Sequence, residues 1–216
     1  MKRFFIPLIA LAIGLFSCEE PEEYVHEYEK NPRYTWGSVD FWGPYYEEYG
    51  IENNVLSLSL FTDSLDVNDE NNLIGFGQYL FLEDIFTLPS DTILPAGVYQ
   101  VSESYEPFTI APGYLYVEDK VEYDLGAMIY YIEKNEAYTV LKYIVDGTMT
   151  VSLVNDSQTI IDFDFILDDE TELKGRFSSQ LPHFDSSVPS QVNKANSRRR
   201  MKSNPVRNLV LQGTRK

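Results

Sequence analysis

The stretch TMTVSLVNDSQTIIDFDFIL, residues 148–167, contains two apolar runs separated by the polar residues 155–157. In the second run, apolar residues recur at every other position and fall on one face of an extended chain, namely Ile161, Phe163, Phe165 and Leu167. Asp162, Asp164 and Ile166 fall on the other face. Because side chains alternate between the two faces of a strand, one face is expected to meet a core. The short polar break predicts an antiparallel hairpin.

Similar short runs, bounded by turn-forming residues, occur on both sides of this hairpin. They cover residues 54–61, 78–86, 98–102, 127–133, 137–145 and 172–181. Asp146-Gly147 separates the run 137–145 from the run 148–154 and is predicted to form a close turn. No stretch of about ten residues or more has the period of an amphipathic helix. The sequence therefore predicts an all-β domain over residues 34–182, either an antiparallel β-sandwich or a flattened β-barrel of about eight or nine strands.

The net charge of the chain is −17 and is unevenly placed along it. Residues 18–182 hold 33 acidic and 7 basic residues, whereas residues 183–216 hold 8 basic residues and one acidic residue. Nucleic-acid affinity comes mainly from Lys and Arg replacing phosphate counterions, so the acidic body is not expected to bind DNA or RNA. The basic tail, residues 183–216, is predicted to be mostly disordered. Three roles are considered for this tail: it folds back on the domain, binds anionic lipid headgroups or contacts a partner.

The N-terminal sequence MKRFFIPLIALAIGLFSC, residues 1–18, has a charged start and then an apolar run that is too short to span a bilayer. Its end, LFSC, resembles the lipobox of bacterial lipoproteins. That resemblance implies removal of residues 1–17 as a signal peptide and lipid attachment at Cys18, so that the membrane is reached through an N-terminal lipid. Cys18 is the only cysteine, which excludes a disulfide within the chain. Residues 18–33, acidic and proline-bearing, are predicted to form a disordered tether.

A wider resemblance covers residues 34–181. SVDFWGPYYEEYGIENNVLSLSLF, LPAGVYQVSES, FTIAPGY and DGTMTVSLVNDSQTIIDFDFILDDETELKGRFSS follow one another in the order found in a group of Bacteroidetes lipoproteins of uncharacterised function. The glutamates after Cys18 also look like the acidic export signal of such lipoproteins. The resemblance implies a β-rich domain at the outer membrane or cell surface, and it brings no catalytic residues with it.

The chain offers few residues for catalysis or metal binding. Its two histidines, His26 and His183, lie outside the predicted core and have no metal-binding spacing. The loop DVNDENN, residues 66–72, has oxygen-bearing side chains at alternating positions but lacks the glycine and the glutamate of a calcium loop. Residues 18–182 hold 33 acidic residues, so the spacing of any one carboxylate pair does not identify a catalytic pair, and a glycan hydrolase is left as a lesser alternative. We therefore expect no catalytic residues, no metal site and no cofactor.

The segment YTWGSVDFWGPYYEEYG, residues 34–50, is rich in aromatic residues and contains both tryptophans. Aromatic rings beside carboxylates can stack on sugars, and exposed rings are common anchors in protein interfaces. The candidate ligand-binding residues are Trp36, Trp42, Tyr45, Tyr46 and Tyr49. The competing interpretation is that these rings close one end of the domain, since large aromatic residues are usually buried.

These observations predict an exported, lipid-anchored and non-catalytic protein of the outer membrane or cell surface. Its expected role is that of a binding or accessory module for a glycan or a surface protein. The alternative within the same location is a structural envelope lipoprotein, whose basic tail contacts a protein partner.

Overall fold

The computed structural model describes residues 29–68, 73–132, 139–155 and 158–187. The long strands in this part of the chain are β1 (Arg33–Gly43), β2 (Asn54–Thr62), β5 (Gly77–Thr87), β11 (Thr139–Asn155), β12 (Gln158–Leu167) and β13 (Glu172–Ser179). The shorter ones are β3 (Leu65–Val67), β4 (Leu73–Gly75), β6 (Gly97–Val101), β7 (Thr109–Ile110), β8 (Tyr114–Glu118), β9 (Val121–Leu125), β10 (Ala127–Ile132) and β14 (His183–Asp185). A 3₁₀ helix, η1, spans Glu47–Tyr49. Cys18, the predicted signal peptide and residues 188–216 of the predicted tail lie outside the described residues.

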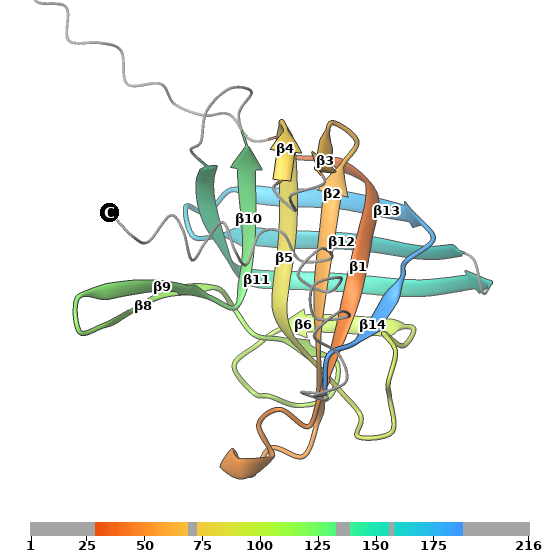
Figure 1. Cartoon of the computed structure of the whole chain (residues 1–216), viewed down its shortest axis with the longest axis vertical. Coiled ribbons are helices and arrows are strands. Elements are labelled where there is room, and N and C mark those ends of the chain that lie inside the picture. Colours follow the sequence, from red (N-terminus) through yellow and green to blue (C-terminus); the bar gives the residue numbers. More distant parts are fainter. Residues whose placement is uncertain (1–28, 69–72, 133–138, 156–157, 188–216) are drawn as a thin grey trace, which may run out of the picture.

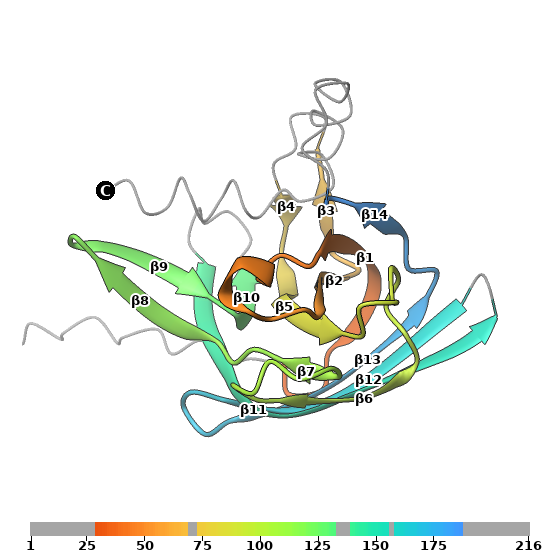
Figure 2. The same ribbon diagram turned by 90° about the horizontal axis from the view of Figure 1, so that it is seen from below.

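The main sheet closes on itself to form a barrel (Figures 1 and 2). Among the described residues, a ring of eight strands runs β1-β2-β5-β7-β6-β11-β12-β13 and returns to β1. Strand β10 also bridges β5 and β11, toward the end of the barrel that carries the β3–β4 hairpin. The predicted all-β class is thus confirmed, and the sheet is a closed barrel.

The barrel is mixed, in contrast to the purely antiparallel sheet expected from the sequence. Strand β1 runs parallel to both β13 and β14, and β6 runs parallel to β7. Strands β1 and β13 come from opposite ends of the domain, so no close turn dictates their relative direction. The tightly connected pairs β11–β12 and β12–β13 are antiparallel, as their short connections predict.

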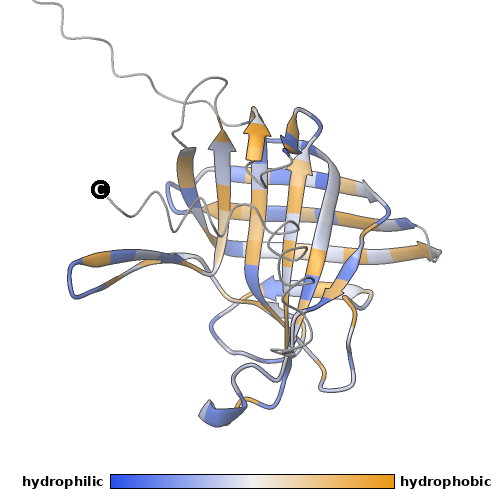
Figure 3. Cartoon of the chain, viewed as in Figure 1, coloured by the Kyte–Doolittle hydropathy of each residue, from blue (hydrophilic) through white to orange (hydrophobic). Residues whose placement is uncertain are grey.

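The inside of the barrel is filled with apolar side chains. The alternation predicted for residues 161–167 is confirmed, because Ile161, Phe163, Phe165 and Leu167 are buried in this core. Asp162 and Asp164 are exposed on the outer face. Leu56, Leu58 and Leu60 of β2 reach the same core from the other side of the barrel. Figure 3 shows the alternation of apolar and polar residues along the strands.

Strand β11 corrects one prediction. Residues 137–145 and 148–154 were expected to be two strands joined by a turn at Asp146-Gly147, but Thr139–Asn155 is a single strand. Gly147 has a φ of 118°, and the pairing with β12 shifts register between Ile144 and Asp146. The glycine and the bulge bend the strand instead of reversing it, so its first part pairs with β10 and its later part with β6.

The outer face of β1, β2, β5 and β10 carries a second apolar cluster. Phe61, Tyr79, Met128 and Tyr130 form it together with Leu65 and Leu73 of the β3–β4 hairpin, which folds over this face. Strand β2 is consequently buried on both faces. Within the described residues, no helix has the length and apolar character needed to cross a membrane.

Candidate functional site

Apolar side chains fill the interior of the barrel, so the candidate binding residues lie on its outer surface. At the end opposite the β3–β4 hairpin, β1 finishes at Gly43, whose φ of 69° turns the chain into η1. Helix η1 ends at Tyr49 and is followed by Gly50, whose N–H donates to the Glu47 carbonyl. Trp42 at the end of β1 and Tyr45, Tyr46 and Tyr49 in the segment after it therefore lie at this end of the barrel.

We call these rings and their neighbours the end cluster: Trp42, Tyr45, Tyr46, Tyr49, Phe86 and Tyr105. Their ring centroids follow one another at 6.4 Å from Trp42 to Tyr45, 5.0 Å from Tyr45 to Tyr46 and 6.4 Å from Tyr46 to Tyr49. Phe86 of β5 connects Tyr46, at 6.0 Å, to Tyr105, at 5.4 Å. The successive rings from Trp42 to Tyr49 are inclined at 61° to 88°, so they form edge contacts and not one flat platform.

The inner part of the end cluster is held by hydrogen bonds to the outer face of the barrel. Trp42 donates its indole N–H to Ser57 Oγ at 3.0 Å, and Tyr46 donates its hydroxyl to Asp84 Oδ2 at 2.7 Å. Asp84 can face outward because β5 bulges opposite Ser57, with Leu82 and Ile85 on either side both buried in the core. These two hydrogen bonds hold Trp42 and Tyr46 in place. The more exposed rings of Tyr45 and Tyr49 pack against them.

The Tyr46–Asp84 pair sits in a partly desolvated position. Burial raises the pKa of the Asp84 carboxyl above its ordinary value, and the hydrogen bond from Tyr46 partly lowers it. Burial and the nearby Asp84 charge both raise the pKa of the Tyr46 hydroxyl. Tyr46 therefore remains a hydrogen-bond donor, and the pair has a structural role beneath the surface rings.

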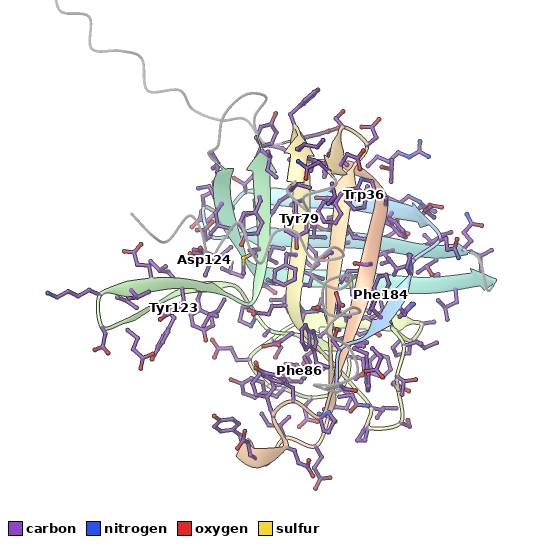
Figure 4. All side chains as sticks on the ribbon, viewed as in Figure 1. Trp36, Tyr79, Phe86, Tyr123, Asp124 and Phe184 are labelled. Carbon is purple, nitrogen blue, oxygen red and sulfur yellow. The ribbon has the colours of Figure 1, made fainter. Side chains whose placement is uncertain are left out.

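Tyr45 and Tyr49 are the exposed members predicted from the sequence, with 58% and 77% of their surfaces accessible. Trp36, by contrast, lies far along β1 under the β3–β4 hairpin. Its ring stacks on Phe61 at 3.9 Å and its indole N–H donates to the Leu65 carbonyl. The fold therefore brings together Trp42, Tyr45, Tyr46 and Tyr49 and leaves Trp36 in the second apolar cluster; Figure 4 labels Trp36 in this position.

A second exposed aromatic group adjoins the end cluster. Strands β8 and β9 form a separate two-stranded sheet that projects from the barrel, as both ribbon views show (Figures 1 and 2). Its apolar side chains are exposed on both faces: Tyr114, Leu115, Tyr116, Val117, Val121 and Tyr123. Its turn residues Asp119 and Lys120 both have positive φ, the conformation of a tight two-residue hairpin.

The base of the β8–β9 hairpin lies near Tyr105 of the end cluster and near Asp84. Burial raises the pKa of the Tyr114 hydroxyl, and Tyr105 and Asp84 raise it further. We call the combined exposed rings the tyrosine surface, which consists of Tyr45, Tyr49, Tyr105, Tyr114, Tyr116 and Tyr123. Sequence reasoning missed the last four because they lie far from residues 34–50 in the chain. The available signal was the stretch YLYVEDKVEY, residues 114–123, in which apolar residues occupy both faces of the predicted strands on either side of a charged turn.

The sites considered for metals and catalysis fall elsewhere. His183 Nε2 accepts a hydrogen bond from the Leu94 N–H at 3.2 Å, and burial lowers the pKa of its imidazole. His26 and residues 69–72 of the loop 66–72 lie outside the described residues. Within the described ranges, no group of three or more His, Cys, Asp or Glu side chains is arranged to hold a metal ion. No family model, curated protein or solved structure matches this chain.

Proposed function

We propose that this chain is a non-catalytic binding module that recognises a protein partner through the tyrosine surface. The observation that supports it is the presence of six exposed tyrosines on three segments: the η1 segment, the β6–β7 connection and the β8–β9 hairpin. Tyrosine offers a large contact area with a polar tip and loses little rotamer freedom, and it is enriched among residues that dominate interface energetics. A monomeric domain usually buries such rings or spaces them apart.

The shape of the β8–β9 hairpin favours a protein ligand. It projects away from the barrel, and its two strands pair with each other in a sheet of their own. Such an element supplies backbone donors and acceptors along its edges, together with apolar side chains on both faces. The acidic residues Glu118, Glu122 and Asp124 alternate with the rings, so the partner is expected to present apolar and basic groups.

A glycan is the second ligand class, supported by exposed Tyr45 and Tyr49 beside Glu47 and Glu48. Carboxylates accept hydrogen bonds from sugar hydroxyls, and a single ring can stack on a sugar face. The steep angles between successive rings of the end cluster argue against a long flat stack on an extended polysaccharide. The protein ligand is therefore the first proposal.

The proposed location is the outer membrane or cell surface, with the chain held there by lipid on Cys18. In support, the predicted tether enters the barrel at Arg33, the start of β1, whereas the end cluster follows Gly43 at the other end of that strand. Eleven extended residues span about 35 Å. Several acyl chains hold a protein stably on a bilayer, and this arrangement would turn the tyrosine surface away from it.

The test is photo-crosslinking in cells that carry the full-length chain. A photoreactive amino acid is placed at Tyr49 or Tyr116, and at the exposed Val154 of β11 as the matched control. We expect the same discrete adduct from Tyr49 and Tyr116 and not from Val154. Adducts of equal yield at all three positions would contradict the proposal. Retention on immobilised polysaccharides, lost in Tyr45→Ala/Tyr49→Ala, would instead favour the glycan.

A further inference from the structure

The outer face of β1 and β2 contains polar side chains that are buried although they point away from the barrel core. Residues of β2 alternate, with Leu56, Leu58 and Leu60 inward, so Ser57 and Ser59 point outward. The facing residues of β1 are Ser38 and Asp40, which pair with Ser59 and Ser57. All four are buried, and Asp40 has only 5% of its surface accessible.

The polar group is continuous with carboxylates and a buried tyrosine on β5. Tyr79 is fully buried, and its hydroxyl is 3.1 Å from Ser59 Oγ. Glu83 and Asp84 occupy the bulge opposite Ser57. We call this set the acidic face: Ser38, Asp40, Ser57, Ser59, Tyr79, Glu83 and Asp84. Described segments already cover part of this face: the β3–β4 hairpin lies over Tyr79, and Trp42 and Tyr46 contact Ser57 and Asp84.

The described chain ends beside the acidic face. Strand β14 pairs with β1, from Val39 to Phe41. Beyond it, the Ser186 N–H donates to the Phe41 carbonyl at 2.7 Å, and the Ser186 hydroxyl donates to Asp40 Oδ1 at 3.2 Å. The last described residues, Ser186 and Ser187, therefore lie beside this face.

The segment that follows has the charge and the length to cover it. Residues 188–216 contain eight Lys and Arg residues and no Asp or Glu. Their 29 residues would reach about 95 Å when extended, several times the length of a strand.

We propose that residues 188–216 dock in cis on the acidic face, with their Lys and Arg side chains toward Asp40, Glu83 and Asp84. Opposite charges that meet at a partly desolvated surface attract more strongly than fully exposed pairs. The segment thus forms an outer layer over β1, β2 and β5, beside Trp42 and Tyr46 of the end cluster. This inference does not depend on the proposed protein partner.

The test is peptide binding in trans, measured by fluorescence anisotropy. A labelled peptide of residues 188–216 is titrated into the full chain and into a chain that ends at Ser187. We expect binding to the shortened chain and at least tenfold weaker binding to the full chain, whose face is already occupied. A peptide with all eight Lys and Arg replaced by Gln is the matched control and should bind at least tenfold more weakly than the native peptide. Equal binding to both chains, or no binding to a folded shortened chain, would overturn the proposal.

A second measurement covers the case in which the shortened chain does not fold. Zero-length carbodiimide coupling of the full chain joins lysine amines to carboxyls, and mass spectrometry identifies the pairs within monomers. We expect Lys194 or Lys202 to be coupled to Asp40, Glu83 or Asp84. Coupling of these lysines only to acids elsewhere would overturn the proposal. So would binding of the full chain to phosphatidylglycerol vesicles through residues 188–216 without any coupling to the acidic face.

Discussion

Replacement of Gly147 by alanine is expected to destabilise the barrel severely, because β11 bends there while it closes the sheet. At a φ of 118° an L side chain is strained by about 1–3 kcal/mol. An added Cβ would also lie 2.2 Å from the Asp164 carbonyl oxygen and 2.6 Å from Phe165 Cα, and neither backbone atom can move freely. Overpacking of this kind costs about 1–3 kcal/mol. The expected loss in the free energy of unfolding is therefore about 2–6 kcal/mol.

The matched control is Gly50→Ala, at the end of η1. Gly50 also has a positive φ, 81°, but no atom lies within 4 Å of an added Cβ. Only the backbone strain remains there, about 1–2 kcal/mol. Urea unfolding followed by fluorescence of Trp36 and Trp42 measures both losses. Losses that agree within about 0.5 kcal/mol would refute the close approach of β11 to β12 at Gly147.

Three further changes address other parts of the molecule. Burial raises the folded-state pKa of Asp84, so its contribution to stability is present below the unfolded pKa and is lost as the pH rises through the folded pKa. The free energy of unfolding of Asp84→Asn, measured in urea, should therefore rise relative to that of the native chain as the pH increases from 3 to 8. A difference between the two chains that does not change with pH would contradict this reasoning. Leu58→Ala, inside the barrel, should cost about 2–5 kcal/mol by the same assay, against about 0.5 kcal/mol or less for exposed Val98→Ala; similar losses would place Leu58 outside the core. Cys18→Ala should abolish metabolic labelling with palmitate, and retained label would rule out lipid attachment at Cys18.

Local pattern was sufficient to predict the β class and the β11–β12–β13 meander. Short polar connections restrict neighbouring strands to antiparallel pairing, and the alternation in residues 161–167 selects the buried face. Closure of the barrel depends instead on pairs that are remote in sequence, such as β1 with β13. An Asp-Gly pair is compatible with a hairpin turn and with a bend inside one strand. The sequence alone therefore could not assign Asp146-Gly147 to the bend in β11.

The candidate site was predictable in part for a similar reason. Trp36 and Trp42 are both on the outer face of β1, but six residues of extended chain place them about 20 Å apart. One stacks in the second apolar cluster and the other supports the end cluster. Phe86 and Tyr105 join the end cluster only through the tertiary fold. No local period in residues 34–50 contains that information.

We propose the tyrosine surface as the binding surface of this module. The most direct test is the dissociation constant of the purified partner, identified by crosslinking, for the native chain and for Tyr49→Ala/Tyr116→Ala. Loss of two anchor rings should weaken binding at least tenfold, while Val154→Ala should leave the constant unchanged. Equal dissociation constants for all three chains, each folded, would contradict the claim.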